Sequence, residues 1–268
     1  MDSQTSRGFT LVEVLMVLII IGVLATMSLS TMGTSLEEAR FNSTLSDMKT
    51  LRDAAVGNVN LEDSFGRRAH FGFFGDIGAI PATIGALTAI GAKAAWATDA
   101  TSRISSGWNG PYLSSTNASK DYTKDAWDNA YTYTTTASGA KFVSKGADGA
   151  VGGTGYDADI TVEIPDEMRL ASVYGHFNLA GKPFTATNFD VRIWYPNGGT
   201  GAITSTLLTV VPASKGLFQF SNIPMGVRSV QIFWPSEGAA AATIGPIVFT
   251  LDSQNYVVSS VLTDIDPP

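Results

Sequence analysis

A long uncharged apolar run near the N-terminus constrains this chain more than any other feature. Residues 9–36 carry one charged side chain, Glu13, within the stretch GFTLVEVLMV. From residue 9 to residue 31 the run is long enough to span about 30 Å of hydrocarbon as a helix. A lone carboxylate that faces lipid costs a few kcal/mol. The position of Glu13 therefore requires an explanation beyond membrane anchoring.

Three interpretations of this segment differ in how they treat Glu13. A secretory signal would have a basic head and a small-x-small cleavage site, whereas the head MDSQTSRG has one acid and one base. A plain anchor leaves the glutamate unexplained. Cleavage between Gly8 and Phe9 would give Phe9 a free α-amine four residues before Glu13, on the same helix face. The two charges can then neutralise each other, within one chain or between neighbours.

The stretch RGFTLVEVLMVLIIIGVLATM resembles the class III leader and helix of type IV pilins and pseudopilins. This resemblance implies that a prepilin peptidase cuts after Gly8 and methylates Phe9, and that Glu13 guides assembly. It also implies a single-pass insertion in the inner membrane before an inner-membrane assembly platform builds the filament.

After residue 31 the apolar pattern becomes one-sided. Apolar residues recur at three- and four-residue steps, which predicts an amphipathic helix; they are Leu36, Phe41, Leu45, Met48, Leu51 and Ala55. Gly57 followed by Asn58 is a helix stop signal. A continuous helix from residue 9 to about residue 56 would be about 70 Å long.

Composition excludes several classes of function. The 268 residues are 15% charged with a net charge of -7, and no basic stripe is present, so no nucleic-acid partner is predicted. The chain has no cysteine, which excludes disulfides and thiolate catalysis. Because no acid-base pair, nucleophile triad or phosphate loop emerges, we predict that the protein is not an enzyme.

A glycine-rich loop in the middle of the chain is a candidate metal site. It follows two alternating segments, residues 130–134 and 141–144, that predict a β-hairpin. Within FVSKGADGAVGGTGYDADI it contains Asp148, Asp157 and Asp159. Calcium takes six to eight oxygen ligands from carboxylates and carbonyls, and magnesium fits less well. The residues alone leave open whether the loop is a metal site or an exposed turn.

The order GWNGPYL, KDAWDNAYTYT and SKGADGAVGGTGYDADI is similar to the major pseudopilin of type II secretion. The resemblance implies one structural calcium ion in place of a C-terminal disulfide. It implies carboxylate ligands from Asp148 and Asp159, then Asp157, with the carbonyls of Lys145 and Ala150. Ala126 stands where the family usually has proline, so a looser turn is expected there.

More than 100 residues follow the loop and predict a second domain. Alternating segments separated by turns indicate a β-sandwich; they are ASVYGHFNLA, FDVRIWYP, GLFQFSNIP, RSVQIFWP and PIVFTLDSQNYVVSSVLT. The pair containing GKP and GLFQFSNIPMG resembles the transthyretin-like fold of carboxypeptidase regulatory domains. The expected fold class is α+β, with a leader (1–8), a helix (9–57), a globular domain with a small antiparallel sheet (58–163) and the sandwich (164–268).

Some features allow two interpretations. Arg67 and Arg68 suit a solvated face better than a binding patch. The aromatic residues Trp194, Tyr195, Phe233 and Trp234 suit either core packing or a carbohydrate platform. A short helix is expected at residues 84–90.

The sequence favours a filament subunit that polymerises with itself and with other pilins. It would lie in the inner membrane before assembly and in a periplasmic or extracellular filament afterwards. The alternative is a minor subunit at the filament tip that acts as an adhesin or binds secretion cargo through the C-terminal domain.

Overall fold

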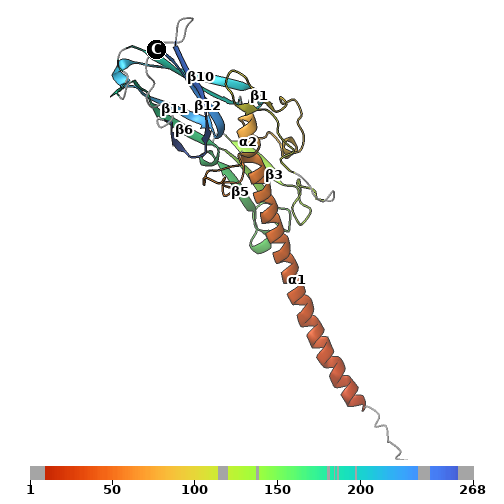
Figure 1. The fold of residues 1–268 in the computed structure, drawn as a ribbon. Coiled ribbons are helices and arrows are strands. Elements are labelled where there is room, and N and C mark those ends of the chain that lie inside the picture. Colours follow the sequence, from red (N-terminus) through yellow and green to blue (C-terminus); the bar gives the residue numbers. More distant parts are fainter. Residues whose placement is uncertain are drawn as a thin grey trace, which may run out of the picture.

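The computed structural model of the protein has one long helix that projects from a head built mainly of strands (Figure 1). It describes residues 10–113, 120–136, 139–179, 182–183, 185, 187–196, 198–234 and 242–258. Gly8 and Phe9, the predicted processing residues, lie outside the described residues. The predicted α+β fold with a C-terminal β-sandwich is confirmed.

The long helix changes character along its length. α1 (Leu11–Val56) has 46 residues, or about 69 Å at 1.5 Å per residue. Its apolar first half is exposed, with Ile20 at 52%, whereas Met48 and Leu51 in the second half are fully buried against the head. The predicted one-sided pattern is confirmed for Met48, Leu51 and Ala55, which are buried, and for Phe41 and Leu45, which are partly buried, whereas Leu36 is 52% exposed. Over the residues that the structure describes, no helical segment combines the length and the hydropathy needed to cross a bilayer.

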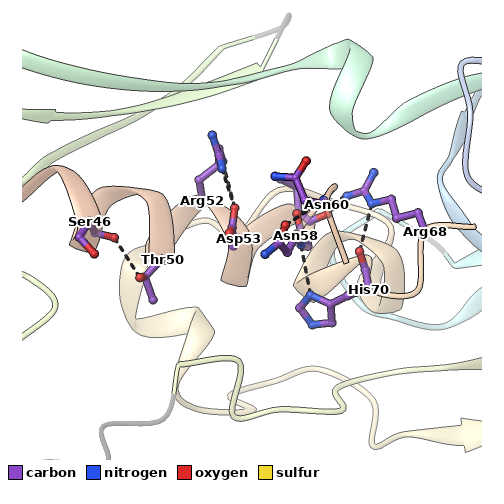
Figure 2. A network of polar contacts seen from close by, with 10 residues as sticks. Ser46, Thr50, Arg52, Asp53, Asn58, Asn60, Arg68 and His70 are labelled. Atoms are coloured by element: carbon purple, nitrogen blue, oxygen red, sulfur yellow. Dashed lines mark hydrogen bonds and ion pairs between the residues drawn. The ribbon is translucent and has the colours of Figure 1, made fainter. Parts of the chain in front are cut away.

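Arg68 caps the C-terminal end of α1. Its guanidinium donates to the carbonyl oxygens of Val56 and Gly57, and to that of His70 at 3.0 Å. Figure 2 shows Arg68 and His70 beside this end of the helix. The last carbonyls of a helix lack intrahelical donors, and a cation there is favoured by the helix dipole. Arg68 is therefore buried, so the solvated face predicted for it is wrong, whereas Arg67 is exposed.

The N-terminal half of the head folds around the second half of α1. Its strands are β1 (Ala97–Thr98), β2 (Ser105–Ser106), β3 (Thr132–Thr136), β4 (Gly139–Ser144) and β5 (Ile160–Pro165), and its helix is α2 (Gly72–Ile77). The strands β3, β4 and β5 form one antiparallel sheet in that order. Tyr133 pairs with Phe142 and their rings stack at 4.7 Å, which confirms the hairpin. The helix expected at residues 84–90 is a 3-10 turn, Ile84–Leu87.

The C-terminal half is a sandwich of two sheets, with strand orders β10-β9-β12-β13 and β11-β6-β14. Its strands are β6 (Leu170–His176), β9 (Phe189–Pro196), β10 (Ile203–Val210), β11 (Leu217–Pro224), β12 (Gly226–Trp234), β13 (Ala242–Leu251) and β14 (Asn255–Val257), beside a short pair, β7 (Asn178–Leu179) and β8 (Lys182–Pro183). The two sheets enclose one apolar cluster that includes Val173, Val191 and Val230, all fully buried. Sequence reasoning missed β10.

The two halves of the head are in direct contact. Phe71, which precedes α2, packs against the apolar cluster of the sandwich. The backbone N–H of Ala94 donates to the carbonyl of Thr200 at 2.9 Å, and the hydroxyl of Ser229 donates to the carbonyl of Ser102 at 2.6 Å. The domain boundary near residues 164–167 stays a prediction.

Candidate functional sites

Thr10 and Glu13 form a reciprocal cap at the start of α1. The hydroxyl of Thr10 accepts the backbone N–H of Glu13 at 3.3 Å, and Glu13 Oε2 accepts the backbone N–H of Thr10 at 3.0 Å. This capping box satisfies two backbone donors that the helix itself leaves open. The sequence signal for this cap is the pattern T-x-x-E at residues 10–13, which was not identified from the sequence. The charge pair with Phe9 stays a prediction.

The apolar residues in the first half of α1 form a continuous exposed surface. Each of the following is at least half exposed: Leu11, Val12, Val14, Leu15, Met16, Val17, Leu18, Ile19, Ile20, Ile21, Val23 and Leu24. They point to every side of the helix, because they are nearly consecutive. Such a surface is stable only when lipid or other helices cover it.

The glycine-rich loop joins β4 to β5 and folds back on itself. The backbone N–H of Ala147 donates to the carbonyl of Tyr156 at 2.9 Å. Gly153 has a φ of 81°, and a Cβ there would lie 2.4 Å from the carbonyl oxygen of Asp157. Glycine is required at this point because only glycine combines a positive φ with so close an approach.

The predicted metal ligands all lie on this loop. The carboxylates of Asp148, Asp157 and Asp159 are exposed, and Asp148 Oδ1 accepts the backbone N–H of Ala150 at 2.9 Å. In the described part of the chain, no three or more His, Cys, Asp and Glu side chains are grouped so that they could hold a metal ion. The carbonyl oxygens of Lys145 and Ala150 receive no hydrogen bond from the described residues.

Asp125 is a buried residue whose hydrogen bonds hold the start of the glycine-rich loop, and it was not identified from the sequence. The residue is 7% exposed. Its Oδ1 accepts the backbone N–H groups of Trp127 and Asn129, both at 2.9 Å, and its Oδ2 accepts the hydroxyl of Ser144 at 2.6 Å. Asn129 in turn donates its side-chain amide to the carbonyl of Gly146 at 2.8 Å. The segment KDAWDN therefore holds the start of the glycine-rich loop in place.

The same segment is tied to α1. The indole N–H of Trp127 donates to Glu37 Oε2 at 2.6 Å, and the backbone N–H of Ala126 donates to Thr44 Oγ1 at 3.1 Å. Proline has no N–H to donate, so the proline usual in the family could not form the second bond. The looser turn expected at Ala126 stays a prediction.

The aromatic residues of the sandwich are largely covered. Phe233 is 8% exposed. The guanidinium carbon of Arg192 lies 5.2 Å from the ring centroid of Phe233 and 5.3 Å from that of Trp194. Tyr195 and Trp234 pack against the core of the sandwich. Core packing and cation–π contacts account for these residues better than a carbohydrate platform does.

Comparisons with known families agree with this arrangement. Residues 73–163, from α2 to β5, match the family described as Type II secretion system (T2SS), protein G. Residues 4–29, which include the start of α1, match the Prokaryotic N-terminal methylation motif. No curated protein and no solved structure matches the chain. The two family matches confirm the resemblance to type II secretion pilin-like proteins, and the C-terminal sandwich lies outside both.

Proposed function

We propose, on the premise that this chain is a type II secretion pilin-like protein, that it is a structural, non-enzymatic subunit of a pseudopilus or type IV pilus-like filament. The exposed apolar surface on the first half of α1 carries this proposal. A surface of this kind on every side of a helix is covered completely only by lipid or by a bundle of like helices. The subunit polymerises mainly with itself, and other pilins can join the same filament.

Processing precedes assembly in this proposal. A prepilin peptidase cuts after Gly8 and methylates the new amino group of Phe9. The capping box places Glu13 in the first turn of α1, four residues after Phe9 in the chain. The intact mass of subunits from native filaments tests this step, and the expected mass lacks residues 1–8. A subunit that retains Met1 would refute the proposed processing.

The chain occupies two environments in turn. Before assembly, the apolar part of α1 lies in the inner membrane as a single-pass anchor, where the assembly platform collects it. After assembly the same surface is buried among neighbouring helices of a periplasmic or extracellular filament. The head is joined to the second half of α1, so the C-terminal sandwich is carried on the filament surface.

We also propose that the glycine-rich loop holds one structural calcium ion. The proposed ligands are the carboxylates of Asp148 and Asp159, then Asp157, with the carbonyls of Lys145 and Ala150. Because the described structure does not group these carboxylates, the ion would have to draw them together. Hard oxygen donors are what calcium requires, and the two carbonyls are open to a further partner. The ion would cross-link a loop that no disulfide can close, since the chain has no cysteine.

Removal of calcium is expected to destabilise the head. An ion present at a hundred times its dissociation constant stabilises the folded state by about 2.7 kcal/mol, or about 5–10 °C in a domain of this size. Thermal unfolding of the full-length protein in detergent, with and without chelator, measures this. Asp148→Ala together with Asp159→Ala should match the chelated protein. An unchanged melting curve in chelator would exclude the ion.

The second candidate function is that of a minor tip subunit, which acts as an adhesin or a cargo binder. Exposed apolar residues on the sandwich favour it, namely Leu207, Leu217, Val227, Val248 and Val257. Sheared filaments distinguish the two functions by stoichiometry. A major subunit dominates the preparation, whereas a tip subunit is rare in it.

A further inference from the structure

The two halves of the head meet in an interface that we call the interdomain junction, formed by α2 and residues 101–112 against β9 and β12. It is closely packed. A Cβ on Gly78 would lie 2.3 Å from the carbonyl oxygen of Pro196. Arg228 on β12 reaches across the junction and donates to the carbonyl of Gly75 on α2 at 3.1 Å. A change in the charge of a side chain in the interdomain junction therefore affects closely packed atoms of both halves.

The charge of Arg228 is buried among carbonyl oxygens. The side chain is 1% exposed. Besides the bond to Gly75, it donates to the carbonyls of Pro224 at 2.6 Å, Met225 at 2.5 Å and Val227 at 2.7 Å. No carboxylate of the described residues forms an ion pair with it. Burial lowers the pKa of Arg228 to about 9, which still leaves it charged at neutral pH.

Asp76 on α2 is the negative group of the junction. Its Oδ2 accepts the phenol of Tyr112 at 2.9 Å, and among the described residues it has no salt-bridge partner. Asp76, Tyr112 and Arg228 line a cavity of about 540 Å³ between the two halves. Burial raises the pKa of Asp76 to about 6, although the Tyr112 bond and the charge of Arg228 oppose the rise.

Other charged groups face the same cavity, and their effects on the pH dependence have to be distinguished from that of Asp76. Asp63, Arg68 and His70 line it from the segment before α2, and Asp53 of α1 acts on Arg68 and His70. Burial, with help from Arg68, lowers the pKa of His70. When the pKa of a histidine is lower in the folded state than in the unfolded state, the folded state loses stability as the pH falls below the ordinary pKa of histidine. His70 therefore acts with the opposite sign to a carboxyl whose pKa is raised.

We propose that Asp76 makes the interdomain junction pH-sensitive, so that the sandwich is held more tightly on the N-terminal half when this carboxyl group is protonated. At a pH between 3.8, the ordinary pKa of the Asp76 carboxyl group, and about 6, Asp76 keeps a proton in the closed junction and releases it in an open junction. The stability of the closed state consequently falls as the pH rises through this window and stays at the lower level above it. Two pKa units correspond to about a hundredfold at most in the closed-to-open equilibrium.

Thermal unfolding of the full-length protein in detergent is the first test. The wild-type protein is expected to melt at a higher temperature at pH 5 than at pH 7.5. Asp76→Asn should melt at pH 7.5 close to the wild-type value at pH 5, and its melting temperature should no longer rise from pH 7.5 to pH 5. The control His70→Gln should keep it. A wild-type melting temperature no higher at pH 5, or an unaltered dependence in Asp76→Asn, would overturn the proposal.

Two further measurements hold even if Asp76→Asn does not fold. Tyr112→Phe removes the bond that favours the ionised carboxyl, so the midpoint of the pH dependence should move to higher pH; an unmoved midpoint contradicts the proposal. Because the chain has no cysteine, spin labels can be placed at Val151→Cys and Leu217→Cys, one on each half. Their distance distribution should narrow from pH 7.5 to pH 5, and an unchanged distribution contradicts the proposal.

Discussion

Replacement of Glu13 by glutamine is expected to remove nearly all filaments while cleavage after Gly8 continues. Glutamine keeps an oxygen that can accept the backbone N–H of Thr10, so the capping box survives and only the charge is lost. In a bundle of apolar helices the amino group of Phe9 would then be buried without a partner. Such a loss costs about 3–5 kcal/mol, which lowers the affinity between subunits by about a hundredfold or more.

Sheared filaments, quantified by electron microscopy and immunoblotting, measure the effect, and intact mass confirms cleavage. Thr10→Ala is the matched control, because it removes the hydroxyl acceptor of the cap and keeps the charge of Glu13. It should cost the helix about 1 kcal/mol and leave filaments near normal. The reverse ranking of the two variants would mean that Glu13 acts as a helix cap and not as one half of a charge pair.

The elements that sequence reasoning predicted well are those whose signal is local. The apolar spacing that includes Met48 and Leu51 placed the second half of α1, and Gly57 marked its end. The alternation in β3 and β4 placed the hairpin on which Tyr133 and Phe142 stack. In each case the residues that give the pattern contact one another within a few positions of the chain or across a single turn.

Strand β10 shows why the rest was harder to predict. The strand, with the sequence ITSTLLTV, lies at the edge of the four-stranded sheet. Five of its residues before Val210 are polar or exposed, and these residues occur on both faces of the sheet. An edge strand buries little on either side, so the two-residue period that marks a half-buried strand is weak. Its place is set by pairing with β9, which no local pattern reports.

Single polar residues were the least predictable part of the candidate sites. Arg67 and Arg68 are adjacent in sequence, but only Arg68 meets the end of α1 and the carbonyl of Met168, 100 residues away. Asp125 gave no signal beyond a common turn, although its carboxylate accepts a hydrogen bond from Ser144 at the end of β4. Whether such a side chain is buried depends on acceptors and donors brought from distant segments, and the sequence around it does not contain them.

Replacement of Arg228 by alanine is expected to lower the free energy of unfolding by about 3–5 kcal/mol. The substitution removes the donors that serve the carbonyls of Gly75, Pro224, Met225 and Val227. Each buried acceptor left unpaired costs about 1–3 kcal/mol, and the missing side chain leaves a cavity. Relief from burying the guanidinium charge offsets part of this sum. Because Arg228 crosses the interdomain junction, the two halves should also unfold less cooperatively.

Urea unfolding of the full-length protein, followed by tryptophan fluorescence and by circular dichroism, measures both effects. The two signals should coincide in the wild type and separate in Arg228→Ala. Arg67→Ala is the matched control, since it removes a half-exposed arginine paired with Asp63 at 3.0 Å and should cost less than about 1 kcal/mol. A similar small loss in Arg228→Ala, with coincident signals, would show that other donors serve these carbonyls. The junction would then be held by apolar contacts such as that of Phe71 with the sandwich core.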